Sequence, residues 1–121
     1  MPVIKPLHWI ASAKRDLLAM PGAVQDSFGF ALHLAQLGEK HADAKPLQGF
    51  GSAGVLEVVE STQGSTYRAV YTVKIQGAVY VLHCFQKKSV KGIATPKPDM
   101  DLIRDRLALV LRSVTGKPSI Q

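Results

Sequence analysis

The sequence predicts an α+β fold, with an N-terminal helical hairpin packed on an antiparallel β-sheet meander and a C-terminal helix closing the structure. Apolar residues recur at helical spacing from about 9 to 37 and again from about 99 to 113, whereas residues 55–86 contain strand-like stretches separated by glycine turns. The chain has 121 residues, of which 46% are hydrophobic, so it can build one sizeable core. We therefore assign residues 1–121 to a single domain.

The N-terminal third is expected to form a short strand and two helices. Residues 3–7 are an extended candidate that flanking prolines restrict to a sheet edge. Residues 9–20 have the apolar spacing of a helix, which Pro21 ends before a second helix over 22–37. Gly38 stops this second helix. Its core positions are Val24, Phe28, Ala31, Leu32 and Ala35.

Three strands are predicted to form the meander, at about 55–60, 67–75 and 79–86. Gly64 and Gly77 lie in the two short connections, where tight hairpin turns need positive φ angles. The third strand is apolar on both faces, which is typical of a central strand.

The remaining segments are two loops and the closing helix. Residues 39–52 and the basic, proline-containing stretch 89–98 are predicted loops. Asp99 is expected to cap a helix that runs to about residue 113. The apolar stripe of this helix is Ile103, Leu107, Val110, Leu111 and Val114.

Positive charge is concentrated in the second half of the chain. Residues 68–121 contain ten Lys and Arg against three Asp, a net +7, whereas residues 1–67 carry −1. No acidic residue lies between Ser61 and Pro98. This asymmetry indicates an anionic partner, with nucleic acid as the first candidate because phosphate contacts come from Lys and Arg. The alternatives are a solvated basic face or a membrane surface, but no helix has the all-basic polar face that membrane binding favours.

Several classes of site are not supported by the sequence. Cys84 is the single cysteine, which excludes an intramolecular disulfide or a multi-cysteine zinc site, and its apolar strand predicts a buried structural thiol. No metal-ligand spacing, phosphate-binding glycine loop or Ser-His-Asp arrangement is present, so we expect no cofactor. The N-terminus lacks a secretory pattern and no apolar run could span a bilayer, so a cytoplasmic protein is expected.

The candidate catalytic residues suit metal-independent RNA cleavage. That reaction needs a base for the 2′-OH, stabilisation of the pentacoordinate phosphate, and an acid for the leaving 5′-oxygen. Arg68, expected on the wetter face of the middle strand, would stabilise the phosphate together with Lys88 at the end of the next strand. Lys87, beside Lys88, would hold the RNA backbone. His83 or a lysine would transfer protons.

Each of these residues also has a structural explanation. Arg68 could pair with Glu57 or Glu60, and the two lysines could protect a sheet edge. His83 could be a hydrogen-bonded core residue. Further contacts to RNA are assigned to Lys74, Lys91, Lys97 and Phe85.

Most of the chain resembles a known family, the phage-derived proteins of the RelE/HigB branch of the RelE/ParE toxin superfamily. The resemblance is most specific in the string Phe85-Gln86-Lys87-Lys88-Ser89 that follows a strand. It is also carried by Tyr67–Tyr71, Val79–Gln86, Thr95-Pro96, Ile103–Leu107, Pro46-Leu47 and Gly54–Glu57.

This resemblance implies a RelE-like fold and a toxin of a type II toxin–antitoxin pair. Such toxins enter the ribosomal A site and cut mRNA there, and a small antitoxin, often a helix-turn-helix DNA-binding protein, silences them. The superfamily's strand arginine falls on Arg68, and its basic pair falls on Lys87 and Lys88. The sequence departs from the family pattern in two places that concern the acid–base residues. Glu57 is followed by valines, where many relatives have a basic residue, and the last helix has neither the tyrosine nor the histidine that some relatives use.

Two other functions stay open, because a fold does not by itself determine the target. The ParE side of the superfamily inhibits DNA gyrase, which would make the chain a non-enzymatic inhibitor. The third possibility is an inactive prophage-derived protein that binds nucleic acid without cutting it.

Overall fold

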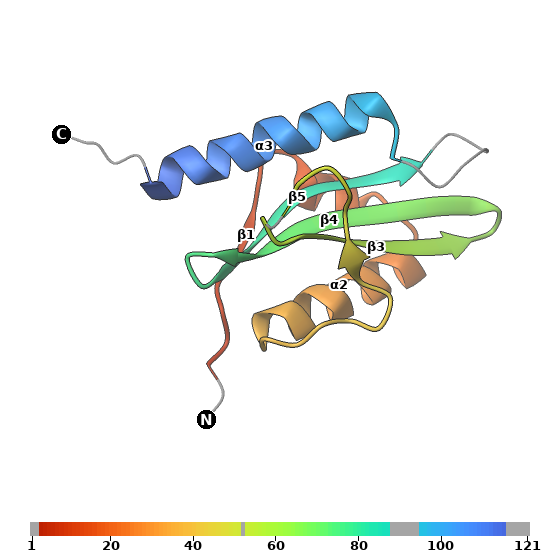
Figure 1. Ribbon diagram of the computed structural model, residues 1–121. Coiled ribbons are helices and arrows are strands. Elements are labelled where there is room, and N and C mark those ends of the chain that lie inside the picture. Colours follow the sequence, from red (N-terminus) through yellow and green to blue (C-terminus); the bar gives the residue numbers. More distant parts are fainter. Residues whose placement is uncertain (1–2, 52, 88–94, 116–121) are drawn as a thin grey trace.

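The computed structural model describes residues 3–51, 53–87 and 95–115. It contains helices on both faces of a mixed five-stranded sheet (Figure 1). The elements are β1 (Leu7–Trp9), α1 (Ala13–Leu18), α2 (Gly22–Gln36), β2 (Lys45–Pro46), β3 (Val55–Thr62), β4 (Ser65–Ile75), β5 (Ala78–Lys87) and α3 (Lys97–Thr115). The strand order is β1-β5-β4-β3-β2, so the α+β class is confirmed.

The predicted meander is present as β3, β4 and β5, each paired antiparallel with the next. Both hairpin turns have two consecutive residues with positive φ: Gln63 and Gly64 at 51° and 79°, and Gln76 and Gly77 at 54° and 63°. Paired positive φ angles are those of a type I′ turn, whose twist matches the flanking strands. β5 lies between β1 and β4, so its central position is also confirmed.

The predicted N-terminal arrangement is wrong in its boundaries and its packing. Trp9 belongs to β1 rather than to a helix, and β1 pairs parallel with β5, with Leu7 opposite Val79. The sheet is therefore mixed. Backbone bonds at both ends of β1, from Val79 N–H to Pro6 O and from Ile10 N–H to Val81 O, stabilise the strand against the local helical pattern.

Helix α1 is only six residues long and packs mainly on β5, so the two helices do not form the expected hairpin on the sheet. Helix α2 matches its prediction, because all five predicted core positions are buried and Gly38 follows it at φ 81°. Figure 1 shows α2 on one face of the sheet and α3 on the opposite face. The two faces bury separate hydrophobic clusters, one under α1 and α2 and one under α3.

The segment 39–52, predicted as a loop, contains the short strand β2. β2 pairs antiparallel with β3, with Lys45 opposite Glu57 and Pro46 opposite Leu56. Pro46 is compatible with this pairing because β2 is an edge strand.

Helix α3 begins at Lys97, so Asp99 lies in its first turn and is not the predicted cap. Ile103, Leu107 and Val110 are buried as expected, but Leu111 is 41% exposed and does not belong to the core stripe. Residues 89–94 of the predicted basic loop lie outside the described residues. In the described parts of the chain, no helix is long and apolar enough to cross a bilayer.

Candidate functional site

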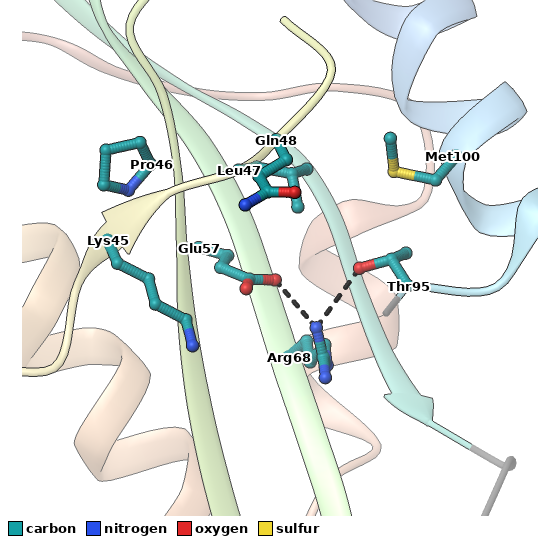
Figure 2. A pocket seen from close by; sticks show the side chains of 8 residues that line it. All are labelled: Lys45, Pro46, Leu47, Gln48, Glu57, Arg68, Thr95 and Met100. Carbon is teal, nitrogen blue, oxygen red and sulfur yellow. Dashed lines mark hydrogen bonds and ion pairs between the residues drawn. The ribbon is translucent and has the colours of Figure 1, made fainter. Parts of the chain in front are cut away.

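A pocket of about 360 Å³ opens between β2, β3, β4 and the start of α3 (Figure 2). Arg68 lies at its floor, and we call it the Arg68 pocket. Its lining residues are Lys45, Pro46, Leu47, Gln48, Glu57, Arg68, Thr95 and Met100. Five of the eight are polar or charged, and the volume falls in the range of ligand-binding pockets.

Arg68 forms a buried ion pair with Glu57 in this pocket. Its Nη1 donates to Glu57 Oε2 at 2.9 Å and to Thr95 Oγ1 at 3.2 Å. The two charged side chains are only 5% and 7% exposed. The expectation that Arg68 lies on a wet face is therefore wrong, and the predicted pairing with Glu57 is confirmed.

The register of the strands explains why these side chains meet. Glu57 lies opposite Val70 on β4, and Arg68 is two residues from Val70, so Arg68 and Glu57 are diagonal neighbours on one face. The same face meets the start of α3, which brings Thr95 to the guanidinium. Residues on strands hold their side chains more rigidly than residues on loops do.

Lys45 and Gln48 are pocket residues that sequence reasoning missed. Lys45 is exposed and lies directly opposite Glu57, which places both side chains on the same face of the sheet. The sequence around Lys45 gives only a weak indication of this pocket. Pro46 is compatible with an edge strand, but nothing in the neighbouring sequence identifies β3 as the partner of that strand.

His83 belongs to a neighbouring pocket of about 490 Å³, between the end of α1, β5 and the start of α3. Its Nε2 lies 2.8 Å from Asp99 Oδ1, and its ring stacks on Phe85 with centroids 4.4 Å apart. Because a carboxylate only accepts hydrogen bonds, Nε2 carries the proton. The prediction that His83 is a hydrogen-bonded core residue is confirmed.

The protonation of His83 follows from its burial. Burial lowers the pKa of His83 below its ordinary value of 6.5, and the hydrogen bond and charge of Asp99 oppose that shift. The ring is therefore neutral at pH 7, and its contact with Asp99 is a hydrogen bond rather than an ion pair. Its Nδ1 is buried and has no hydrogen-bond partner among the described residues.

Two further predicted site residues are buried near Arg68. Phe85 lies opposite Arg68 on the neighbouring strand, and both Phe85 and Lys87 are 8% exposed. The alternative that Lys87 protects a sheet edge is wrong, because β5 is a central strand and Lys87 is buried. Phe85 packs in the cluster under α3, so its face is not an open stacking surface for RNA bases.

The other predicted cations are spread along the molecule. Lys74 is six residues from Arg68 on β4, which corresponds to about 20 Å along the strand. Lys97 is exposed at the start of α3 and pairs with Asp101 at 2.9 Å. Lys88 and Lys91 lie outside the described residues.

The chemistry available in the Arg68 pocket is anion binding next to a carboxylate. Arginine and lysine can contact phosphate oxygens, and Glu57 is the single carboxylate among the lining residues. Within residues 3–51, 53–87 and 95–115, no three His, Cys, Asp or Glu side chains are grouped so that they could hold a metal ion.

The fold and the pocket define an α+β domain with a cationic, strand-supported site. A family model described as "Phage derived protein Gp49-like (DUF891)" matches residues 15–108, which include every residue that lines the Arg68 pocket. The chain therefore belongs to the phage-derived Gp49-like family. This family is RelE/HigB-like and toxin-related, which agrees with the resemblance found in the sequence. A comparison with curated protein sequences gave no match.

Proposed function

We propose that this protein is the HigB-type toxin of a type II toxin–antitoxin system and that it cuts mRNA on the ribosome. The observation that carries the proposal is the buried Arg68–Glu57 pair at the floor of a pocket that Lys45 borders. The pair brings a candidate base, Glu57, and a candidate phosphate-binding cation, Arg68, together on two neighbouring strands. Family membership supports the toxin class, and the geometry supports a nuclease within that class.

In the proposed reaction, Glu57 accepts the proton of the 2′-OH and Arg68 stabilises the charge that develops on the phosphate. The 2′-oxygen then attacks phosphorus and the bond to the 5′-oxygen breaks, which leaves a 2′,3′-cyclic phosphate and a 5′-OH. Thr95 accepts a hydrogen bond from Arg68 Nη1, so it positions the guanidinium.

This assignment changes the roles predicted from the sequence. His83 does not line the Arg68 pocket and its unprotonated Nδ1 is buried, whereas Glu57 lines the pocket beside Arg68, so Glu57 is the better-placed base. Lys87 is buried, Phe85 packs under α3, and neither is a lining residue of the Arg68 pocket, so we assign neither a direct contact with RNA. Lys97, which is exposed at the start of α3, stays a candidate for holding the RNA backbone, as do Lys74, Lys88 and Lys91.

The expected partners are the ribosome, mRNA and a cognate antitoxin, often a helix-turn-helix DNA-binding protein in related systems. These partners would place the protein in the cytoplasm. The net charge of +6 supports binding to ribosomal RNA and mRNA, since cationic surfaces attract phosphate at long range.

The test is primer extension on a reporter mRNA incubated with purified protein, with and without translating ribosomes. Wild-type protein is expected to give cuts that require ribosomes. Glu57→Gln, which keeps the shape of the side chain, is expected to abolish them, whereas the exposed Lys14→Ala should cut like the wild type. Circular dichroism establishes that each variant is folded. Intact mRNA with folded wild-type protein and ribosomes present would refute the nuclease.

One observation favours a second candidate, a non-enzymatic inhibitor of DNA gyrase. Glu57 already neutralises Arg68, which reduces the positive potential that phosphate binding needs. An inhibitor would leave mRNA intact and would block gyrase in a DNA supercoiling assay. An inactive protein that only binds nucleic acid would do neither, and its binding would weaken steeply with salt.

A further inference from the structure

We infer that Lys45 is the catalytic acid that protonates the leaving 5′-oxygen of the cut RNA. The inference rests on the proposed nuclease function and adds a residue that the predicted site lacked.

The pairing of β2 with β3 places Lys45 beside the reacting groups. Lys45 lies opposite Glu57 in the antiparallel register, and directly opposed side chains on one face have Cβ atoms about 5 Å apart. Figure 2 shows Lys45 and Arg68 on either side of the Glu57 side chain. The three residues come from three adjacent strands, in the order cation, carboxylate, cation.

Lys45 is also the available cation in this pocket. Arg68 is 5% exposed at its side chain and bonds to Glu57 and Thr95, whereas Lys45 is exposed and has no ion-pair partner within the part of the chain that the structure describes. Its ammonium group can therefore reach a substrate at the pocket mouth without breaking an existing ion pair. Lys97, the exposed cation at the start of α3, is already paired with Asp101.

The other proton donors predicted from the sequence are less suitable. The protonated Nε2 of His83 donates to Asp99, and His83 does not line the Arg68 pocket. Lys87 is only 8% exposed. A general acid must come within hydrogen-bond distance of the atom that it protonates. Lys45 lines the Arg68 pocket, and His83 and Lys87 are not among its lining residues.

The 2′-OH gives its proton to Glu57, and the 2′-oxygen forms a bond to phosphorus. The bond from phosphorus to the 5′-oxygen breaks, and that oxygen takes a proton from the ammonium of Lys45. Proton exchange with water then returns Glu57 to its carboxylate form and Lys45 to its ammonium form.

The experiment compares two mRNAs that differ at one atom of the cut site, on ribosomes and at saturating protein. One mRNA has the normal 5′-oxygen, and the other has a bridging 5′-sulfur, whose thiolate leaves without protonation. On the oxygen substrate, Lys45→Ala should lower the cleavage rate by about 10²–10⁴-fold, the range for loss of a general acid. On the sulfur substrate it should cut at nearly the wild-type rate.

Two controls separate an acid from a structural or binding residue. Lys40→Ala, an exposed lysine five residues away, should cut both substrates like the wild type. Glu57→Gln should lose activity on both, because sulfur replaces only the need for an acid. β2 pairs through its backbone, so alanine at position 45 preserves the fold, which circular dichroism verifies.

The results that overturn the inference are distinct from those that overturn the proposed function. Full activity of Lys45→Ala on the oxygen substrate, or an equal loss on both substrates, refutes Lys45 as the acid while the nuclease stands. Failure of the wild type to cut either mRNA refutes the nuclease and the inference with it.

Discussion

Arg68 and Glu57, which lie on adjacent strands, form an ion pair 2.9 Å long that is almost completely removed from solvent. A buried pair of this kind is a poor source of stability by itself, because desolvation offsets the attraction between the charges. Its position at the floor of the Arg68 pocket fits the proposed function, which needs a cation and a carboxylate together. Removal of either Arg68 or Glu57 would leave the other charge buried and unpaired, which lowers the free energy of unfolding.

Removing one member of this pair should destabilise the protein more than removing both. Arg68→Ala leaves Glu57 buried and unpaired, so the free energy of unfolding should fall by about 3–5 kcal/mol. The double variant Arg68→Met with Glu57→Leu should recover most of that loss and remain inactive. Urea unfolding followed by circular dichroism measures both changes, and equal losses in the single and double variants would contradict the explanation.

The buried His83 should make stability depend on pH. Its folded pKa is lowered by burial, so below about pH 6.5 the unfolded state binds more protons than the folded state. The free energy of unfolding should therefore fall as the pH is lowered from 7.5 to 5. His83→Gln should reduce that slope, and His33→Gln, at an exposed position of α2, should leave it unchanged. If His83→Gln leaves the pH dependence of the free energy of unfolding unchanged, His83 is not its cause.

Gly54, which precedes β3, should not tolerate alanine. It has φ +77°, and an added Cβ would lie 2.7–2.9 Å from the Cβ, Cγ and Cδ atoms of Lys74. The backbone strain alone is worth about 1–3 kcal/mol. Gly29→Ala is the matched control, because this exposed position in α2 has open space and should gain about 0.5–1 kcal/mol. Thermal unfolding should show a lower melting temperature for Gly54→Ala and a higher one for Gly29→Ala than for the wild type.

Arg106 connects α3 to the rest of the fold. Its guanidinium donates to Leu82 O at 2.8 Å and to Ser12 Oγ at 3.2 Å. Arg106→Met should cost about 1–3 kcal/mol because the carbonyl of Leu82 loses its charged partner. Arg112→Met, at an exposed position later in the same helix, should change the free energy of unfolding by less than about 0.5 kcal/mol.

Cys84 should be inert in the folded protein. The thiol is buried, and burial raises its pKa to about 12, so almost no reactive thiolate is present at neutral pH. Ellman's reagent should report no free thiol in buffer and one in 6 M guanidinium chloride. Rapid labelling of the native protein would show that β5 opens readily near Cys84.

Some of this structure could be predicted from local pattern. Helix α2 was identified together with its core, because a 3.6-residue apolar period depends only on neighbours in sequence. The three meander strands and their glycine turns were identified for the same reason. The concentration of positive charge in the second half of the chain is a property of composition alone.

The arrangement of the site was decided by the tertiary structure. Lys45, Glu57 and Arg68 meet because β2 pairs with β3 and β3 pairs with β4, and nothing in segment 45–46 indicates which strand it joins. The burial of Arg68 and the hydrogen bond from His83 to Asp99 depend on how the start of α3 packs on the sheet. Such contacts join residues far apart in sequence, and their energies are gained only once the whole sheet and its covering helices are in place. The sequence therefore determined the helices, the meander and the charge, whereas long-range packing determined which charged groups share a pocket.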